Sequence, residues 1–88
     1  MRLFITAGEP SGDHLGGAFL CALRTLEPAV EVRGVGGATM GAEGLKSLFP
    51  QADLAVMGLA EVLPRLALLL RRIEETAQSI ATFRPDLV

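Results

Sequence analysis

Several residue types that commonly build a functional site are scarce in this sequence. Its 88 residues contain one cysteine, one histidine, no tryptophan and no tyrosine. A single cysteine cannot form an internal disulfide, which is typical of proteins of a reducing cytoplasm. Because Cys21 and His14 stand alone, no cluster of metal ligands is predicted, and we expect neither a metal nor another cofactor. Cys21 lies among apolar residues, which favours a buried structural thiol.

Long runs of basic or apolar residues are also absent. The longest basic run is Arg71-Arg72 and the formal net charge is −2, so no nucleic acid partner is expected. The longest strongly apolar run, Leu66 to Leu70, is far shorter than the roughly 20 residues of a membrane-spanning helix. Half of the residues are nevertheless hydrophobic. This high share suggests that some apolar surface meets a partner, a membrane or a further part of the protein.

The first half of the chain predicts a β-α-β unit. A continuous apolar run within residues 2–7 is typical of a central parallel strand covered on both faces. Ser11 is predicted as the N-cap of a helix. Apolar residues at three-four spacing indicate that this helix extends to Glu27. A second strand over 30–35 completes a unit of about thirty residues, for which parallel strands and a right-handed crossover are expected.

The second half predicts further elements of the same fold class. A short helix over 39–45 and a brief strand over 54–57 come first. Pro64 is expected to open the main helix, because a proline inside a helix removes a hydrogen bond. This helix should extend to Phe83, and residues 85–88 have the pattern of an entering strand. We interpret the chain as a piece of a larger doubly wound α/β domain, with a naturally short chain as the alternative.

The turn after the first strand reads AGEPSGDHLGG over residues 7–17. Its glycine spacing matches neither the dinucleotide fingerprint nor the Walker loop, and Glu9 and Asp13 would repel a phosphate. Carboxylates at the carboxyl end of a parallel strand suit the hydroxyl groups of a sugar. One interpretation is therefore a sugar site with Glu9, Ser11 and Asp13 as polar contacts. The alternative is that Ser11 and Asp13 only cap the helix while Glu9 points to water.

Two nearby features carry weaker signals. The stretch 34–37 begins like a dinucleotide pattern, but Thr39 replaces its last glycine, so a tight turn is favoured. His14 has no second histidine beside it, and a partly exposed helical position without a role is predicted.

Four stretches together resemble the N-terminal part of the lipid-A-disaccharide synthase family. They are AGEPSGD, GVGGATM-x-AEGL, LAVMGLAEVLPRL and RPDLV, in this order, and the resemblance covers essentially all 88 residues. Many members carry Leu-His-Gly after SGD, whereas this chain has His14-Leu15-Gly16. His14 is therefore given no role.

The resemblance implies a partial GT-B glycosyltransferase. Residues 1–88 would form an incomplete, Rossmann-like N-terminal domain that faces the acceptor, with a parallel sheet and flanking helices; the C-terminal nucleotide-sugar domain is absent from these residues. The implied reaction transfers 2,3-diacylglucosamine, with inversion, from its UDP conjugate to 2,3-diacylglucosamine 1-phosphate, and UDP leaves. This step belongs to lipid A biosynthesis, and the 88 residues alone are expected to be inactive. The loop residues Gly8, Glu9, Ser11, Gly12 and Asp13 would border the sugar, while the catalytic residue, an aspartate, is expected beyond Val88.

The implied substrates carry acyl chains. The resemblance therefore predicts a cytoplasmic enzyme that binds peripherally to the cytoplasmic face of the inner membrane. The positions expected to meet the bilayer are Ala60, Val62, Leu63, Leu66, Leu69 and Leu70. Arg65, Arg71 and Arg72 would suit anionic headgroups. The same stripe also fits a core-facing helix, and Leu68 on the opposite side is predicted to be exposed. A small nucleotide-binding module and a non-enzymatic membrane-surface protein remain as alternative functions.

Overall fold

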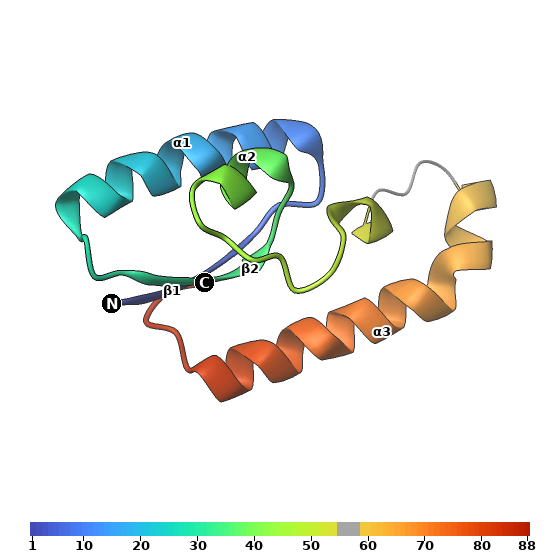
Figure 1. The fold of residues 1–88 in the computed structure, drawn as a ribbon. Coiled ribbons are helices and arrows are strands. Elements are labelled where there is room, and N and C mark those ends of the chain that lie inside the picture. The colour runs from blue at the N-terminus through green and yellow to red at the C-terminus, as the bar shows by residue number, and fades with distance from the viewer. Residues whose placement is uncertain (55–58) are drawn as a thin grey trace.

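The computed structural model describes residues 1–54 and 59–88, and its side chains are described for 1–54 and 64–88. The elements in chain order are β1 (Arg2–Thr6), α1 (Pro10–Leu26), β2 (Glu31–Val35), α2 (Ala38–Ala42), the 3-10 helix η1 (Gln51–Leu54) and α3 (Leu59–Phe83). Figure 1 shows α1 and α2 on one face of the sheet and α3 on the other. Among the described helices, none has the length and apolar character needed to cross a membrane.

The sheet confirms the predicted parallel β-α-β unit. β1 and β2 pair in parallel with a register that runs from Arg2 opposite Glu31 to Thr6 opposite Val35. Leu87 forms a parallel bridge with Leu3 on the other edge of β1, so the entering strand predicted at the end of the chain is confirmed at this residue. β1 therefore lies between β2 and the last residues of the chain.

One position of β2 requires glycine. Gly34 has φ +148°, which L side chains rarely adopt. A Cβ at this position would overlap the carbonyl of Ile5 on the neighbouring strand. The backbone of β2 therefore approaches β1 more closely here than a side chain would permit.

One buried hydrophobic cluster, which includes Leu3, Leu20 and Met40, lies between the sheet and the first two helices. The largest fully buried side chains among the described residues are Phe4, Leu20, Val35 and Met40. Burial of such side chains contributes about 1.5–3 kcal/mol each. Leu20 lies on the inward stripe of α1 with Asp13, Gly16 and Gly17.

The structure corrects three predictions in the first half of the chain. Glu9, not Ser11, is the N-cap of α1, because Pro10 already lies in its first turn. The helix predicted over 39–45 spans only Ala38–Ala42. Cys21 is exposed rather than buried, because it follows Leu20 by about 100° around the helix and so leaves the inward stripe.

The second half differs from the predictions around its main helix. α3 begins at Leu59 and contains Pro64 within it, and its first turns run at an angle to the rest (Figure 1). Such a kink follows from the amide hydrogen bond that proline lacks. Leu54 ends the 3-10 helix η1 instead of opening a strand. Residues 55–57 of that predicted strand lie outside the described residues.

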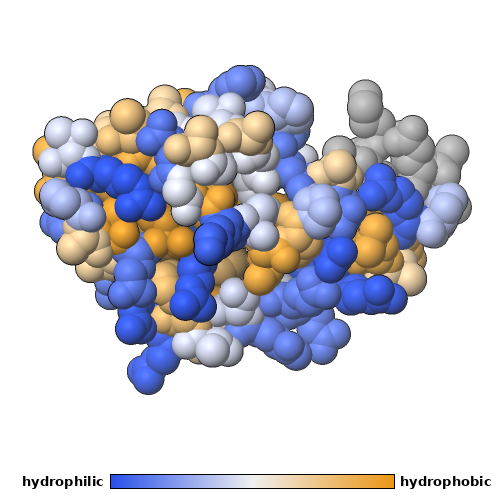
Figure 2. Space-filling model, viewed as in Figure 1, coloured by the Kyte–Doolittle hydropathy of each residue, from blue (hydrophilic) through white to orange (hydrophobic). Residues whose placement is uncertain are grey.

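The apolar stripe of α3 is largely exposed in this chain. Leu66, Leu70 and Ile73 are 45%, 57% and 61% exposed, whereas Leu68, predicted to be the exposed one, is half-buried. Figure 2 shows a small apolar group toward the first half of α3, surrounded by hydrophilic side chains.

Candidate functional site

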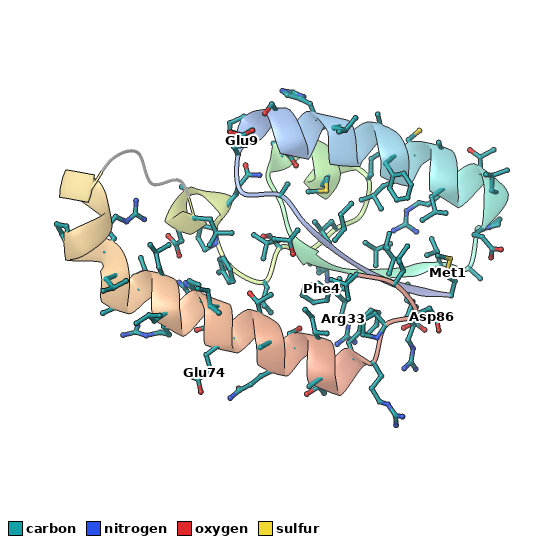
Figure 3. All side chains as sticks on the ribbon, turned by 180° about the vertical axis from the view of Figure 1, so that it is seen from behind. Met1, Phe4, Glu9, Arg33, Glu74 and Asp86 are labelled. Carbon is teal, nitrogen blue, oxygen red and sulfur yellow. The ribbon has the colours of Figure 1, made fainter. Side chains whose placement is uncertain are left out.

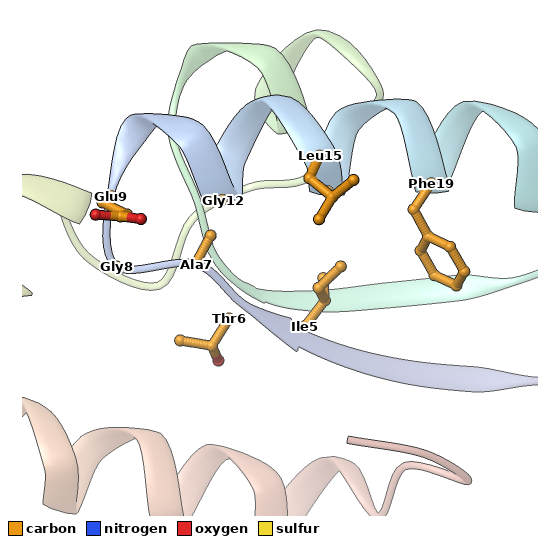
Figure 4. Close-up of a pocket in the computed structure, with 9 residues that line it drawn as sticks. Ile5, Thr6, Ala7, Gly8, Glu9, Gly12, Leu15 and Phe19 are labelled. Carbon is orange, nitrogen blue, oxygen red and sulfur yellow. The ribbon is translucent and has the colours of Figure 1, made fainter.

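The predicted sugar loop lines a groove at the carboxyl end of β1. The groove has a volume of about 650 Å³, and Figure 4 shows it between β1 and α1. Glu9 lies at one end, and Leu15 and Phe19 point from α1 toward Ile5 at the other. Its lining residues are Ile5, Thr6, Ala7, Gly8, Glu9, Gly12, Leu15, Gly16 and Phe19. The groove thus joins a polar end to an apolar floor.

Three of the five predicted contact residues line this groove, namely Gly8, Glu9 and Gly12. Ser11 lies beside them, because its hydroxyl donates a hydrogen bond of 2.6 Å to the Glu9 carboxylate. Both side chains are exposed, and Figure 3 shows Glu9 at the start of α1. The exposed Glu9–Ser11 pair is therefore the part of the loop whose polar atoms a ligand can reach.

Asp13, the fifth predicted residue, occupies a different environment. It is 4% exposed, and its carboxylate accepts hydrogen bonds from three amides at the start of α2. Oδ1 accepts from Gly37 at 2.8 Å and Met40 at 3.0 Å, and Oδ2 from Thr39 at 2.9 Å. Asp13 thus caps α2, in addition to its place in the first turn of its own helix.

The electrostatics of Asp13 follow from these contacts. Burial acts to raise the pKa of its carboxyl group, but the hydrogen bonds from the amides of Met40, Thr39 and Gly37 outweigh burial. The pKa therefore lies below its ordinary value of 3.8. The group is ionised at neutral pH, and its negative charge faces the amino end of α2.

Gln51 contacts the turn between β1 and α1, which the sequence did not indicate. Its side-chain amide donates to the backbone carbonyls of Ala7 at 3.0 Å and Glu9 at 3.1 Å. These partners are 44 and 42 positions away in the sequence. No spacing or motif around Gln51 signals such a contact.

Gly16 and Gly17, which end the glycine-rich stretch, lie inside α1 and serve packing. A Cβ at Gly16 would overlap the Met40 sulfur, and one at Gly17 would overlap the Thr39 side chain. The amides of Gly36 and Gly37 already donate to Ser47 Oγ and to Asp13. The nucleotide-binding alternative therefore finds no support in the turn over 34–37, where these two amide donors are used within the protein.

His14 is exposed, as predicted, and its Nδ1 lies 3.0 Å from Thr39 Oγ1. Within residues 1–54 and 64–88, His, Cys, Asp and Glu side chains form no group of three that could hold a metal ion.

The parallel β-α-β unit places the chain in the class of α/β proteins. In open sheets of this class, the carboxyl ends of the strands are the usual place for a ligand. The family model described as Lipid-A-disaccharide synthetase matches residues 3–88. The chain belongs to this family, which confirms the resemblance.

Curated relatives support the same assignment. The chain is 58% identical over 88 residues to the lipid-A-disaccharide synthase of Ruegeria pomeroyi, covering 100% of the chain and 22% of the relative. The enzyme of Paramagnetospirillum magneticum is 53% identical over 98% of the chain and 22% of its own length. That of Pseudomonas fluorescens is 51% identical over 99% of the chain and 23% of its own length. The chain thus spans about 22% of these relatives.

Proposed function

We propose that this chain forms the acceptor-side part of an inverting GT-B glycosyltransferase of lipid A biosynthesis. The complete enzyme would transfer 2,3-diacylglucosamine from its UDP conjugate to 2,3-diacylglucosamine 1-phosphate and release UDP. The main support for this proposal is the exposed Glu9–Ser11 pair at the polar end of the groove, in a chain that belongs to this family. The catalytic base is assigned to the part of the longer enzyme beyond Val88, and these 88 residues alone should show no turnover.

In this proposal the loop binds sugar hydroxyl groups. The Glu9 carboxylate accepts hydrogen bonds, and the Ser11 hydroxyl both donates and accepts them. Gly8 and Gly12 lack side chains, so a sugar ring can approach the backbone of the turn. Gln51 holds the carbonyls of Ala7 and Glu9, which fixes the turn before the ligand arrives.

We further propose that the first half of α3 meets the inner membrane from the cytoplasmic side. Leu66 and Leu70 are exposed and Leu69 is half-buried. The other three predicted contacts, Ala60, Val62 and Leu63, lie outside the described side chains. Arg71 is exposed beside this surface, whereas Arg72 is bonded to Asp53 and Glu75. Arg72 is therefore withdrawn from the predicted headgroup contacts.

The sugar-binding role of the loop can be tested by comparing substitutions of two glutamates at the two ends of α1. The substitutions are made in the longer enzyme, that is, the complete protein that contains this chain. Glu9→Gln should lower kcat/KM for the acceptor by about 10- to 100-fold, the worth of one hydrogen bond to a charged group. Glu27, the exposed C-cap of α1, supplies the control, and Glu27→Gln should leave the rate unchanged. The measurement is UDP release with both acylated substrates. Wild-type kinetics in Glu9→Gln would contradict the site, and no UDP release by the unaltered enzyme would contradict the function.

A further inference from the structure

The turns that follow β1 and β2 are joined through one buried carboxylate. Asp13 comes from the first turn of α1, and all three of its amide partners lie in or just before α2. The two elements are in contact (Figure 1). Because the charge is buried and ionised, releasing any of these amides would leave it undersatisfied. The joint is therefore held in one geometry.

Close packing restricts movement between the first turn of α1 and the start of α2. The Met40 side chain is fully buried and rests on Gly16, while the Thr39 side chain rests on Gly17. A Cβ on Gly37 would lie 2.8 Å from both the Asp13 carboxylate and the Gln51 side-chain oxygen. Asp13 and Gln51 thus both contact the space that a side chain at Gly37 would occupy.

The joint fixes the backbone that carries Glu9. The amide of Asp13 donates to the Glu9 carbonyl at 3.0 Å, and the side chain of Gln51 donates to the same carbonyl at 3.1 Å. Asp13 itself does not line the groove. Its carboxylate therefore acts on the groove only through the turn that it immobilises.

We propose that Asp13 is a positioning residue of the transferase: its carboxylate clamps the amino end of α2 and so sets the direction of the Glu9 carboxylate toward the acceptor sugar. It does not contact the sugar. This inference rests on the proposed function, because it assigns Glu9 as the group that is positioned.

A double-mutant cycle in the longer enzyme tests the proposal. Asp13→Asn keeps an acceptor for two of the three amides but turns an NH₂ group toward the amide of Thr39. It should lower kcat by about 10- to 100-fold, as expected for a misplaced group, and change KM for the acceptor by less than about threefold. In the Glu9→Gln background, Asp13→Asn should lower kcat by less than about threefold more, since residues that act through one another are not additive.

A matched control comes from the far end of β1. Asp86 also accepts a backbone amide, that of Arg2 at 2.8 Å, but lies away from the groove (Figure 3). Asp86→Asn should leave kcat unchanged in both backgrounds. If the Asp13 and Glu9 effects instead multiply in full, or if Asp13→Asn raises KM with kcat unchanged, Asp13 contacts substrate independently and the proposal is wrong.

A second measurement needs no variant and covers the case in which Asp13→Asn does not fold. Amide hydrogen exchange of residues 37–40 is followed in the unaltered enzyme, with and without 2,3-diacylglucosamine 1-phosphate in detergent micelles. A clamp keeps these amides protected in both states. Faster exchange on binding would mean that the carboxylate leaves them for the sugar, which would overturn the proposal. Absence of UDP release by the unaltered enzyme is a separate result, which contradicts the proposed function itself.

Discussion

Gly16 and Gly17 show that a glycine-rich stretch can serve helix packing instead of ligand binding. In the sequence they continue a glycine-rich stretch that suggests a ligand loop. In the structure they face α2, and the missing side chains let Met40 and Thr39 lie against the backbone of α1. Local spacing cannot reveal this purpose, because the contacting residues lie in a different element.

A substitution at Gly16 should therefore destabilise the protein through overpacking. Gly16→Ala places a Cβ against the fully buried Met40 side chain, which then has to shift. Overpacking of this kind costs about 1–3 kcal/mol. Gly41→Ala is the control, since a Cβ at Gly41 meets nothing within 4 Å and alanine favours a helix. Urea unfolding should show a lower midpoint for Gly16→Ala and an equal or higher one for Gly41→Ala; equal midpoints would contradict the packing argument.

Among the elements, α3 departs most from its sequence pattern. Proline is common in the first turn of helices, so Pro64 indicated a start that the structure places at Leu59. β1, α1 and β2 were predictable because apolar runs and breakers mark them locally. The attachment of α3 to η1 was not, because it depends on Arg72 and Asp53, which come together only through the fold.

Arg72 is a polar anchor between α3 and η1, beside Arg65, whose guanidinium donates to the Ala52 carbonyl of η1 at 3.4 Å. The Arg72 guanidinium lies 2.9 Å from Asp53 and 2.9 Å from Glu75, and 4.9 Å from the centre of the Phe49 ring. The two carboxylates, with the Glu75 hydrogen bond foremost, raise the pKa of Arg72 above its ordinary value, so its guanidinium is charged at neutral pH.

Loss of this anchor should loosen α3. Arg72→Gln should speed amide hydrogen exchange in α3 and η1 and lower Tm of the longer enzyme. Arg72→Lys should do so to a smaller extent, because an ammonium group cannot reproduce the planar fork. Arg71→Gln is the neighbouring control, at an exposed side chain. Equal exchange in the Arg72 and Arg71 variants would show that the Arg72 ion pairs do not hold the helix.

At the scale of the whole molecule, the apolar end of the groove lies along an open edge of the sheet. Leu15 is 75% exposed and Phe19 46% exposed, although both face β1 in Figure 4. Leu87 pairs with this edge, because the amide of Phe4 donates to the Leu87 carbonyl at 2.9 Å. The curated relatives are several times longer than this chain, which spans about 22% of them. We therefore expect the apolar end of the groove to be covered in the longer enzyme, while its polar end at Glu9 stays open.

This expectation predicts different effects on stability for substitutions of two exposed leucines of α1. Leu15 lines the groove, whereas Leu26, 80% exposed, ends α1 away from it. In the longer enzyme, Leu15→Gln should lower the free energy of unfolding by about 1.5–3 kcal/mol, the worth of burying one large aliphatic side chain. Leu26→Gln should change it by less than about 0.5 kcal/mol, as for an ordinary surface position. Chemical denaturation of both variants gives the comparison. If Leu15→Gln is as harmless as Leu26→Gln, the apolar end stays open to solvent in the complete enzyme. The whole groove would then be accessible to the acyl chains of a substrate.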